Sequence, residues 1–278
     1  QAGSLVRVVK NELKKNNTKK KKLLATLTDA ENADALKVMG DLLITYPHLV
    51  TKGMTSVAIE NYYDNNKLLN IPLDPKLNGL KNAEKYFNKY RKLRTAVNYV
   101  NTQLALTTAE IDYFNNIVAQ LEVASPKDVA DIRIELMNGG YIRTTKKSKQ
   151  KPKISKPDRF ESSDGTLIEV GKNNLQNERL SLKQADRRDI WLHVQKIPGS
   201  HVIIHSPQPS ETTLLEAAKL AAYYSKARQS ANVPVDYLPA GKLRKPNGAK
   251  PGFVIFEGQQ TLYVTPEPDL IARLKIKS

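Results

Sequence analysis

The chain has 278 residues, with 44 Lys and Arg against 28 Asp and Glu, a formal net charge of +16, and no Cys. The absence of Cys excludes a disulfide scaffold and any Cys-ligated zinc or iron–sulfur site. The longest apolar runs, such as Val202-Ile203-Ile204, are far shorter than the ~20 residues of a membrane-spanning helix, so no membrane insertion is predicted. The basic excess points to an anionic partner, with nucleic acid as the first candidate, because binding to a polyanion releases its counterions. Since the chain begins with Gln1, we expect it to be a fragment.

Residues 83–121 carry the clearest helical pattern. Spacings of three and four alternate through Ala83, Tyr86, Tyr90, Leu93, Val97, Val100, Leu104, Thr107, Ile111, Phe114, Val118 and Leu121, and only Thr107 interrupts the apolar seam. The average period of 3.5 keeps one stripe facing a partner helix, so the seam predicts a long coiled-coil helix.

The segment from about Leu5 to Ile44 is the predicted partner helix. Its apolar anchors are Leu23, Leu27, Leu36, Met39 and Leu43. Asn16-Asn17 and the run Lys19 to Lys22 interrupt its seam, so we expect its N-terminal part to fray or to lie beyond the pairing. The short insert between the helices favours an antiparallel arm within one chain, about 60 Å long at 1.5 Å per residue. Parallel dimerisation through the 83–121 seam is the alternative.

A small β-hairpin is predicted between the two helices. Thr55 to Tyr63 alternates apolar and polar residues, and Leu68 to Leu73 forms a second short run. Asp64-Asn65-Asn66 lies between them and is typical of a turn.

The predicted fold class is α+β, in three parts. Residues 1–141 form the antiparallel coiled-coil arm with its hairpin insert at about 47–79, residues 142–157 a basic disordered linker, and residues 158–278 a compact domain with a mostly antiparallel sheet. The linker prediction rests on composition, since residues 142–159 hold eight basic residues against one acidic residue and are almost without apolar side chains.

The period changes after the linker, where strands outnumber helices. Strands are expected within 159–170 around an Asp164-Gly165 turn, and at 189–195, 201–206, 233–238, 253–257 and 261–265; helices are expected at 174–185 and, after an N-cap at Ser210, to about 228. The last two strands are predicted to form a hairpin through residues 258–260.

Trp191 and three of the four histidines are predicted to share one sheet face. Period-2 alternation places Trp191 and His193 on one side of their strand, and pairing through the turn at 197–200 adds His201 and His205. This face has three interpretations: a nucleic-acid surface with Trp191 stacked on a base, a metal site, or plain structure with Trp191 in the core. A hydrolase triad of Ser200, His201 and Asp189 is disfavoured, because neighbouring strand residues point to opposite faces and no nucleophile elbow is present.

Two lysine-rich segments are further candidates. Residues 241–252 combine four basic residues with Pro and Gly, which suits a phosphate-contacting loop, although an ordinary solvated loop explains them equally well. On the arm, Lys81, Lys85, Lys89 and Lys92 form a helical stripe with little acid to offset their repulsion, which favours an anionic partner over the alternative of a solvated helix face.

The sequence resembles the RqcH/NEMF family, also called NFACT proteins. The arm carries the similar segments Asp29-Ala30-Glu31-Asn32-Ala33, Gly40-Asp41-Leu42-Leu43, Asn61-Tyr62-Tyr63-Asp64, Ile71-Pro72-Leu73-Asp74-Pro75 and 82–90. The C-terminal part carries Asp189-Ile190-Trp191-Leu192-His193, Ile197-Pro198-Gly199-Ser200-His201 and Lys250-Pro251-Gly252-Phe253-Val254, which look like the NFACT-R domain. Ile190 and Leu192 stand where the family often has Leu and Phe, and they keep the apolar face.

The resemblance implies a C-terminal half of a ribosome-associated quality control factor. Such members bind the large ribosomal subunit with its stalled peptidyl-tRNA and support C-terminal alanine tailing in the cytoplasm. In streptococci the same family is described as fibronectin-binding, so a cell-surface adhesin module that binds fibronectin is the alternative.

The expected partners are therefore the large subunit, rRNA and tRNA. No catalytic residue, metal or cofactor is predicted. Nucleic-acid contacts are predicted for Arg187, Arg188, Asp189, Trp191, His193, Gly199, Ser200, His201, Lys242, Arg244, Lys245 and Lys250, and arm contacts for Lys81, Lys85, Lys89 and Lys92.

Overall fold

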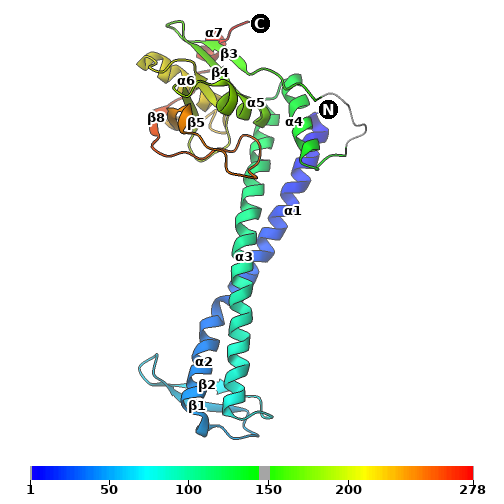
Figure 1. Cartoon of the computed structure of the whole chain (residues 1–278), viewed down its shortest axis with the longest axis vertical. Helices are drawn as coiled ribbons and strands as arrows, with labels where there is room; N and C mark the ends of the chain where they lie inside the picture. Colours follow the sequence, from blue (N-terminus) through cyan, green and yellow to red (C-terminus); the bar gives the residue numbers. More distant parts are fainter. Residues whose placement is uncertain (1, 144–150, 278) are drawn as a thin grey trace. The chain divides into compact units, whose positions relative to one another are not determined.

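The computed structural model describes residues 2–143 and 151–277 (Figure 1). The chain divides into two compact units: Lys15–Glu110, and Gln1–Lys14 combined with Ile111–Ser278. Two helices, α1 (Ala2–Asp29) and α3 (Gly79–Glu122), contribute residues to both units. Within the described residues, no helix combines the length and apolarity that crossing a membrane requires.

The unit Lys15–Glu110 pairs helices from the two ends of its own sequence. After α1, a 3₁₀ turn at Ala30–Asn32 leads into α2 (Ala33–Thr45), which packs with α3 around a core containing Leu42, Leu43 and Ala83. A Cβ on Gly40 would lie 2.8 Å from the Phe87 ring, so glycine is needed for this close approach. Every seam position predicted in α3 is buried or half-buried, which confirms the seam.

A β-hairpin completes this unit, as predicted. After a 3₁₀ turn at Pro47–Leu49, β1 (Ser56–Asn61) pairs antiparallel with β2 (Lys67–Pro72) in a register from Ser56↔Pro72 to Asn61↔Lys67. Asn65 and Asn66 occupy the left-handed region, with φ of 48° and 56°. Asn adopts this conformation more readily than most residues, so the predicted Asn-Asn turn has the expected chemistry.

The other unit begins with the first turns of α1, and here one prediction is wrong. Leu5 is 1% exposed and Val9 is fully buried, in a core with Phe114 and Ile117 of α3. The N-terminal part of α1 therefore does not fray. The following helix, α4 (Pro126–Asn138), closes the same core with Ile132 and Leu136.

A six-stranded antiparallel sheet forms the body of this unit. Its order is β3-β4-β6-β5-β7-β8, with β3 at Asp158–Glu161, β4 at Leu167–Val170, β5 at Ile190–Val194, β6 at Val202–Ile204, β7 at Val233–Pro239 and β8 at Gln260–Val264. Helix α6 (Glu211–Tyr223) contacts the central strands and β8 (Figure 1), and its alanines pack with Leu192, Val202 and Ile204 in the main core. The α+β fold class with a mostly antiparallel sheet is thereby confirmed.

The last part of the chain differs from the prediction. Residues 253–257 form no strand and contribute a single bridge, Arg244↔Ile255, whereas β8 pairs with β7. A helix that was not predicted, α7 (Pro268–Leu274), follows and buries Leu270, Ile271 and Leu274. Helix α5 (Asn174–Arg179) is as expected, and a π-helical turn at Leu180–Gln184 continues it.

The predicted basic linker, 142–157, falls partly on residues 144–150, which lie outside the described residues. In its described part, the Ser155 N–H donates to both carboxylate oxygens of Asp131, at 3.2 Å each. The Lys156 carbonyl accepts from Lys127 Nζ at 3.0 Å. The chain is therefore anchored to α4 before β3 begins at Asp158.

Candidate nucleic-acid interface

Pairing between β5 and β6 brings Trp191 and the three histidines to one face of the sheet, as predicted. The register places Trp191 opposite Ile203 and Leu192 opposite Val202. Trp191 and Ile203 pack in a second core with Leu180 and Leu238, on the face opposite the α6 core.

Trp191 lies inside this second core. Its indole is 1% exposed, stacks on the His193 ring at 5.7 Å with an interplanar angle of 6°, and contacts the Phe256 ring at 4.9 Å. Phe256 comes from the segment that was predicted as a strand and that instead covers this face. A base cannot stack on an indole covered in this way, so the structural interpretation describes Trp191.

His193 and His201 are held as neutral residues. Burial lowers the pKa of both, and that of His201 falls well below its ordinary value because the neighbouring His193 adds to the effect. The rings contact edge to face at 5.6 Å, and His201 Nδ1 is hydrogen-bonded to Ser181 Oγ at 2.8 Å. These imidazoles therefore act as polar parts of the core rather than as cations facing a phosphate.

His205 has separate partners, which bears on the metal and triad interpretations. Its Nε2 lies 2.7 Å from Glu169 Oε1 and its Nδ1 lies 3.2 Å from Asp189 Oδ2, and these contacts raise its pKa. The three imidazoles do not converge, and within the described residues no group of three metal-ligating side chains is found. Asp189 pairs with His205 while His201 pairs with Ser181, so Ser200, His201 and Asp189 form no hydrogen-bonded triad.

Gly199 and Ser200 lie in a tightly packed turn. A Cβ on Gly199 would lie 2.6 Å from Val194 Cγ2 and 3.2 Å from Ser225 Cβ, so no other residue fits without movement. The Ser200 N–H donates to the Tyr224 carbonyl at 3.1 Å. The Ile-Pro-Gly-Ser-His segment thus joins the β5–β6 turn to the end of α6.

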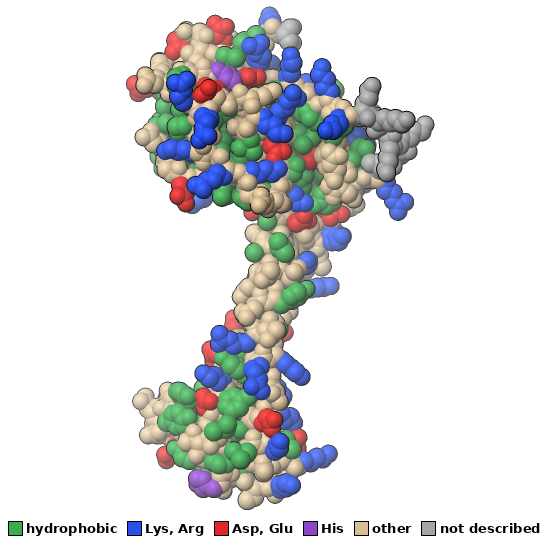
Figure 2. Space-filling view, viewed as in Figure 1, with side chains coloured by type: hydrophobic (Ala, Val, Ile, Leu, Met, Phe, Trp, Pro, Cys, Tyr) green, Lys and Arg blue, Asp and Glu red, His purple; other side chains and the backbone are tan. Residues whose placement is uncertain are grey.

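Four exposed cations of the predicted set lie on neighbouring segments. The Gly241 N–H donates to the Arg187 carbonyl at 2.9 Å, which holds the loop after β7 against the turn before β5. Arg187, Arg188, Lys242 and Arg244 are exposed, and we call these four residues the basic patch. Figure 2 shows basic side chains over much of the visible face of this unit. Within the described residues, only Arg188 of the four forms an ion pair, with Asp186 at 3.6 Å.

The other two predicted lysines of the loop have protein partners. Lys245 forms an ion pair with Glu178. Lys250 Nζ donates to Tyr141 Oη at 2.7 Å and lies 5.1 Å from the ring centres of both Tyr141 and Tyr113. Cation–π contacts of this kind hold an ammonium group in place, so Lys250 joins the loop to α3 and to the residue range after α4.

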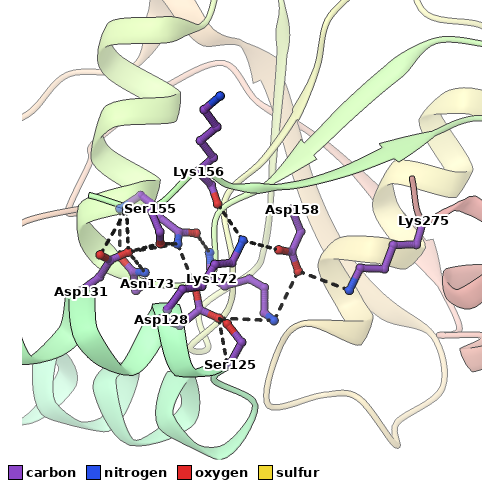
Figure 3. Close-up of polar contacts among 11 residues, drawn as sticks. Ser125, Asp128, Asp131, Ser155, Lys156, Asp158, Lys172, Asn173 and Lys275 are labelled. Atoms are coloured by element: carbon purple, nitrogen blue, oxygen red, sulfur yellow. Dashed lines mark hydrogen bonds and ion pairs between the residues drawn. The ribbon is translucent and has the colours of Figure 1, made fainter. Parts of the chain in front are cut away.

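A polar network between α4 and the segment 172–176 was not predicted (Figure 3). Asp131 accepts hydrogen bonds from Ser155, from Asn173 Nδ2 at 3.1 Å and from Gln176 Nε2 at 3.2 Å, and Asp128 accepts from Gln176 Nε2 at 2.9 Å. Lys172 Nζ lies 3.5 Å from Asp128 and 3.3 Å from Asp158. The sequence signal was three acids, at 128, 131 and 135, spaced along one helical face beside apolar positions.

Glu135 is the third acid of that face and is the most strongly perturbed. Its Oε2 accepts from Tyr113 Oη at 2.9 Å and from Asn174 Nδ2 at 3.2 Å, while no donor among the described residues reaches its Oε1. Burial raises its pKa to about 7, against the lowering effect of these hydrogen bonds and of the nearby Lys250 charge.

The arm lysines divide into two pairs. Lys81 is paired with Glu84 at 3.1 Å and Lys85 with Asp74 at 2.9 Å, which corrects the expectation that little acid offsets them. Within residues 2–143 and 151–277, Lys89 and Lys92 form no ion pair. All four line a shallow groove of about 430 Å³ that also includes Leu77 and Asn88.

Comparisons with known proteins cover nearly the whole chain. Residues 1–156 match the family model described as NFACT N-terminal and middle domains, and residues 156–258 match the NFACT protein RNA binding domain. The chain is 46% identical over 279 residues to the Rqc2 homolog RqcH of Bacillus subtilis, covering 99% of this chain and 49% of that protein. It is 44% identical to the Rqc2 homolog RqcH of Streptococcus suis, covering 99% and 50%.

A solved structure is also similar. The C-terminal part of the fibronectin/fibrinogen-binding protein from Streptococcus suis superposes with a TM-score of 0.80 at 38% identity, covering 99% of this chain and 98% of that one. The chain spans about half the length of the curated relatives that it matches, and corresponds to their C-terminal half.

Proposed function

The chain belongs to the NFACT family, and from this premise we propose that it is the RNA-binding C-terminal half of a ribosome-associated quality control factor. The observation that carries the proposal is the basic patch, which lies within residues matched by the RNA binding domain. Exposed guanidinium and ammonium groups without carboxylate partners are the groups that contact phosphates, because each contact releases counterions.

The finer proposal names the partners. We infer that the chain binds rRNA of the large ribosomal subunit and tRNA, that it works with ribosomes in the cytoplasm, and that it supports C-terminal alanine tailing by the whole protein. The similarity to two RqcH proteins supports this assignment. The chain acts as a binding module, and its buried histidines have structural roles.

The residues proposed to touch RNA are a subset of those predicted. Arg187, Arg188, Lys242 and Arg244 contact phosphates directly. The remaining predicted residues act indirectly: Asp189, Trp191, His193, Gly199, Ser200, His201, Lys245 and Lys250 support the sheet face and the loop that carry the patch. On the arm, Lys89 and Lys92 are the proposed contacts, since their charges have no acidic partner within the described residues.

The test is binding of the chain to purified large ribosomal subunits across a salt titration. A variant with Arg187, Arg188, Lys242 and Arg244 changed to Gln is compared with a matched variant in which Lys151, Lys153, Arg273 and Lys277 are changed to Gln. The net charge of the two variants is equal, so generic attraction affects both alike. We expect the patch variant alone to lose affinity, with a salt dependence weaker by about 0.7–0.9 per lost phosphate contact. Equal losses would refute the patch assignment.

Fibronectin binding is the second candidate, because the similar solved structure is named as part of a fibronectin/fibrinogen-binding protein. Binding of the chain to fibronectin is measured beside subunit binding over the same salt range, with a basic protein of similar charge as control. Fibronectin affinity that survives salt while subunit affinity matches the control would favour an adhesin. Affinity that disappears at moderate salt would be charge attraction, since exposed charges are screened beyond ~8 Å at physiological ionic strength.

A further inference from the structure

A cleft of about 450 Å³ lies in the unit formed by residues 1–14 and 111–278. Its walls come from α3, the segment before α5, the β5–β6 turn and the segment after α6. No residue of the basic patch lines it. The volume falls in the range of small-ligand sites, which is about 300–1,000 Å³.

The cleft is positively charged. Three cations, Lys172, Lys226 and Arg228, line it with a single carboxylate, Glu122. The Lys172 charge is already balanced by Asp128 and Asp158, so Lys226 and Arg228 are the cations left for a ligand. Within the described residues neither of these two forms an ion pair.

Arg228 is fixed in position before any ligand arrives. Its Nε donates to the Tyr223 carbonyl at 2.9 Å, and its guanidinium lies 4.3 Å from the centre of the Tyr223 ring. Both contacts leave the terminal guanidinium nitrogens for an anion, and a fixed fork loses little entropy on binding. The Lys226 backbone is likewise held, because its N–H donates to the Pro198 carbonyl at 3.1 Å.

The cleft also has an unpaired acceptor and an aromatic wall. Gln120 is 6% exposed, and its Nε2 donates to Asn174 Oδ1 at 2.7 Å, yet among the described residues no donor reaches its Oε1. A buried acceptor without a partner costs about 1–3 kcal/mol, so a donor supplied by a ligand is favoured there. The half-buried Tyr224 ring forms part of the same wall.

We propose that this cleft binds one nucleotide of single-stranded RNA. Its phosphate lies on Lys226 and Arg228, its base packs against Tyr224, and a base N–H donates to Gln120 Oε1. Stacking on an aromatic ring combined with phosphate contacts is the general chemistry of single-strand binding. The assignment rests on the proposed RNA-binding function and adds a site that is separate from the basic patch.

The test uses the whole chain and four probes: AMP, ribose 5-phosphate, adenosine and inorganic phosphate, titrated into the millimolar range by NMR. We expect AMP to bind at least tenfold more tightly than each of the other three. Changing Lys226 and Arg228 to Gln is expected to weaken AMP at least tenfold, with folding checked by the emission of the buried Trp191. The control is the patch variant, which is expected to bind AMP normally.

Each alternative result has a defined meaning. Equal affinity for AMP and ribose 5-phosphate would overturn the base site, and undiminished AMP binding by the Lys226/Arg228 variant would overturn the phosphate site. Loss of subunit binding in the patch variant with normal AMP binding separates the two surfaces. If the chain binds AMP in the cleft but no ribosomal subunit, the proposed function fails and the nucleotide site stands; the opposite result reverses both conclusions.

Discussion

Glu135 gives a prediction that links one buried carboxylate to the pH dependence of stability. Burial raises its pKa from the ordinary 4.5 to about 7. Between these values the folded state binds more protons than the unfolded state, so stability falls as pH rises. At about 1.4 kcal/mol per pKa unit, the loss between pH 4.5 and 7 is about 3 kcal/mol.

The change Glu135→Gln removes this titration and keeps an acceptor for Tyr113 and Asn174. We expect the variant to be more stable than the parent by up to about 3 kcal/mol at pH 8, and the difference to disappear near pH 5. The assay is urea unfolding followed by fluorescence of Trp191, the only Trp in the chain, which lies in the same compact unit as Glu135. A difference that stays constant from pH 5 to pH 8 would refute the proton linkage.

Three further outcomes are expected. Gly199→Ala is expected to lower the free energy of unfolding by about 1–3 kcal/mol in urea titrations, because its Cβ would overlap Val194 and Ser225; an unchanged value would mean that the turn relaxes freely. Phe114→Ala, in the core with Leu5, is expected to cost about 3–5 kcal/mol, and a cost near zero would contradict the packing of α1 there. In an NMR titration, His205 is expected to titrate above 6.5 and His201 well below it, and the reverse order would contradict the assigned partners.

The regular elements were predictable where one local signal dominates. The 3.5-residue seam of α3 and the Asn-Asn turn between β1 and β2 each depend on residues close in sequence. The helix α1 was harder, because Asn16-Asn17 and the following lysines break the apolar pattern without breaking the helix. Lys is a good helix former, and the buried Leu5 and Val9 anchor the first turns. The α-helical run is interrupted instead at Ala30–Asn32, where Asp29 and Asn32 flank the 3₁₀ turn.

Residues 253–257 show why alternation does not fix pairing. The pattern predicts that Val254 and Phe256 share a side, and both pack in the core around Trp191. Phe253 and Ile255 are 54% and 48% exposed, so the two-sided character is also as predicted. The positive φ of Gly252, 78°, turns the chain so that it lies over the sheet face, where side chains pack without a strand ladder.

The candidate site was predictable in residue type more than in role. Basic and aromatic residues identified the segments, but only the tertiary fold decides that Trp191 and His201 are buried and that Lys250 lies between two tyrosines. The cleft depends on Gln120 and Arg228, which are more than one hundred residues apart, and no local pattern connects them.

The network around Asp128 and Asp131 constrains how this sequence can evolve. Gln176 Nε2 donates to both carboxylates and to Ser155 Oγ, so one amide serves three acceptors. A single substitution leaves a buried charge or amide unpaired at its full desolvation cost, whereas replacing several partners together with apolar residues is far less costly. Neutral drift at these positions is therefore blocked one step at a time. Descendants of this chain are expected either to keep the whole set or to exchange it in concert, with strong epistasis between α4 and the start of α5.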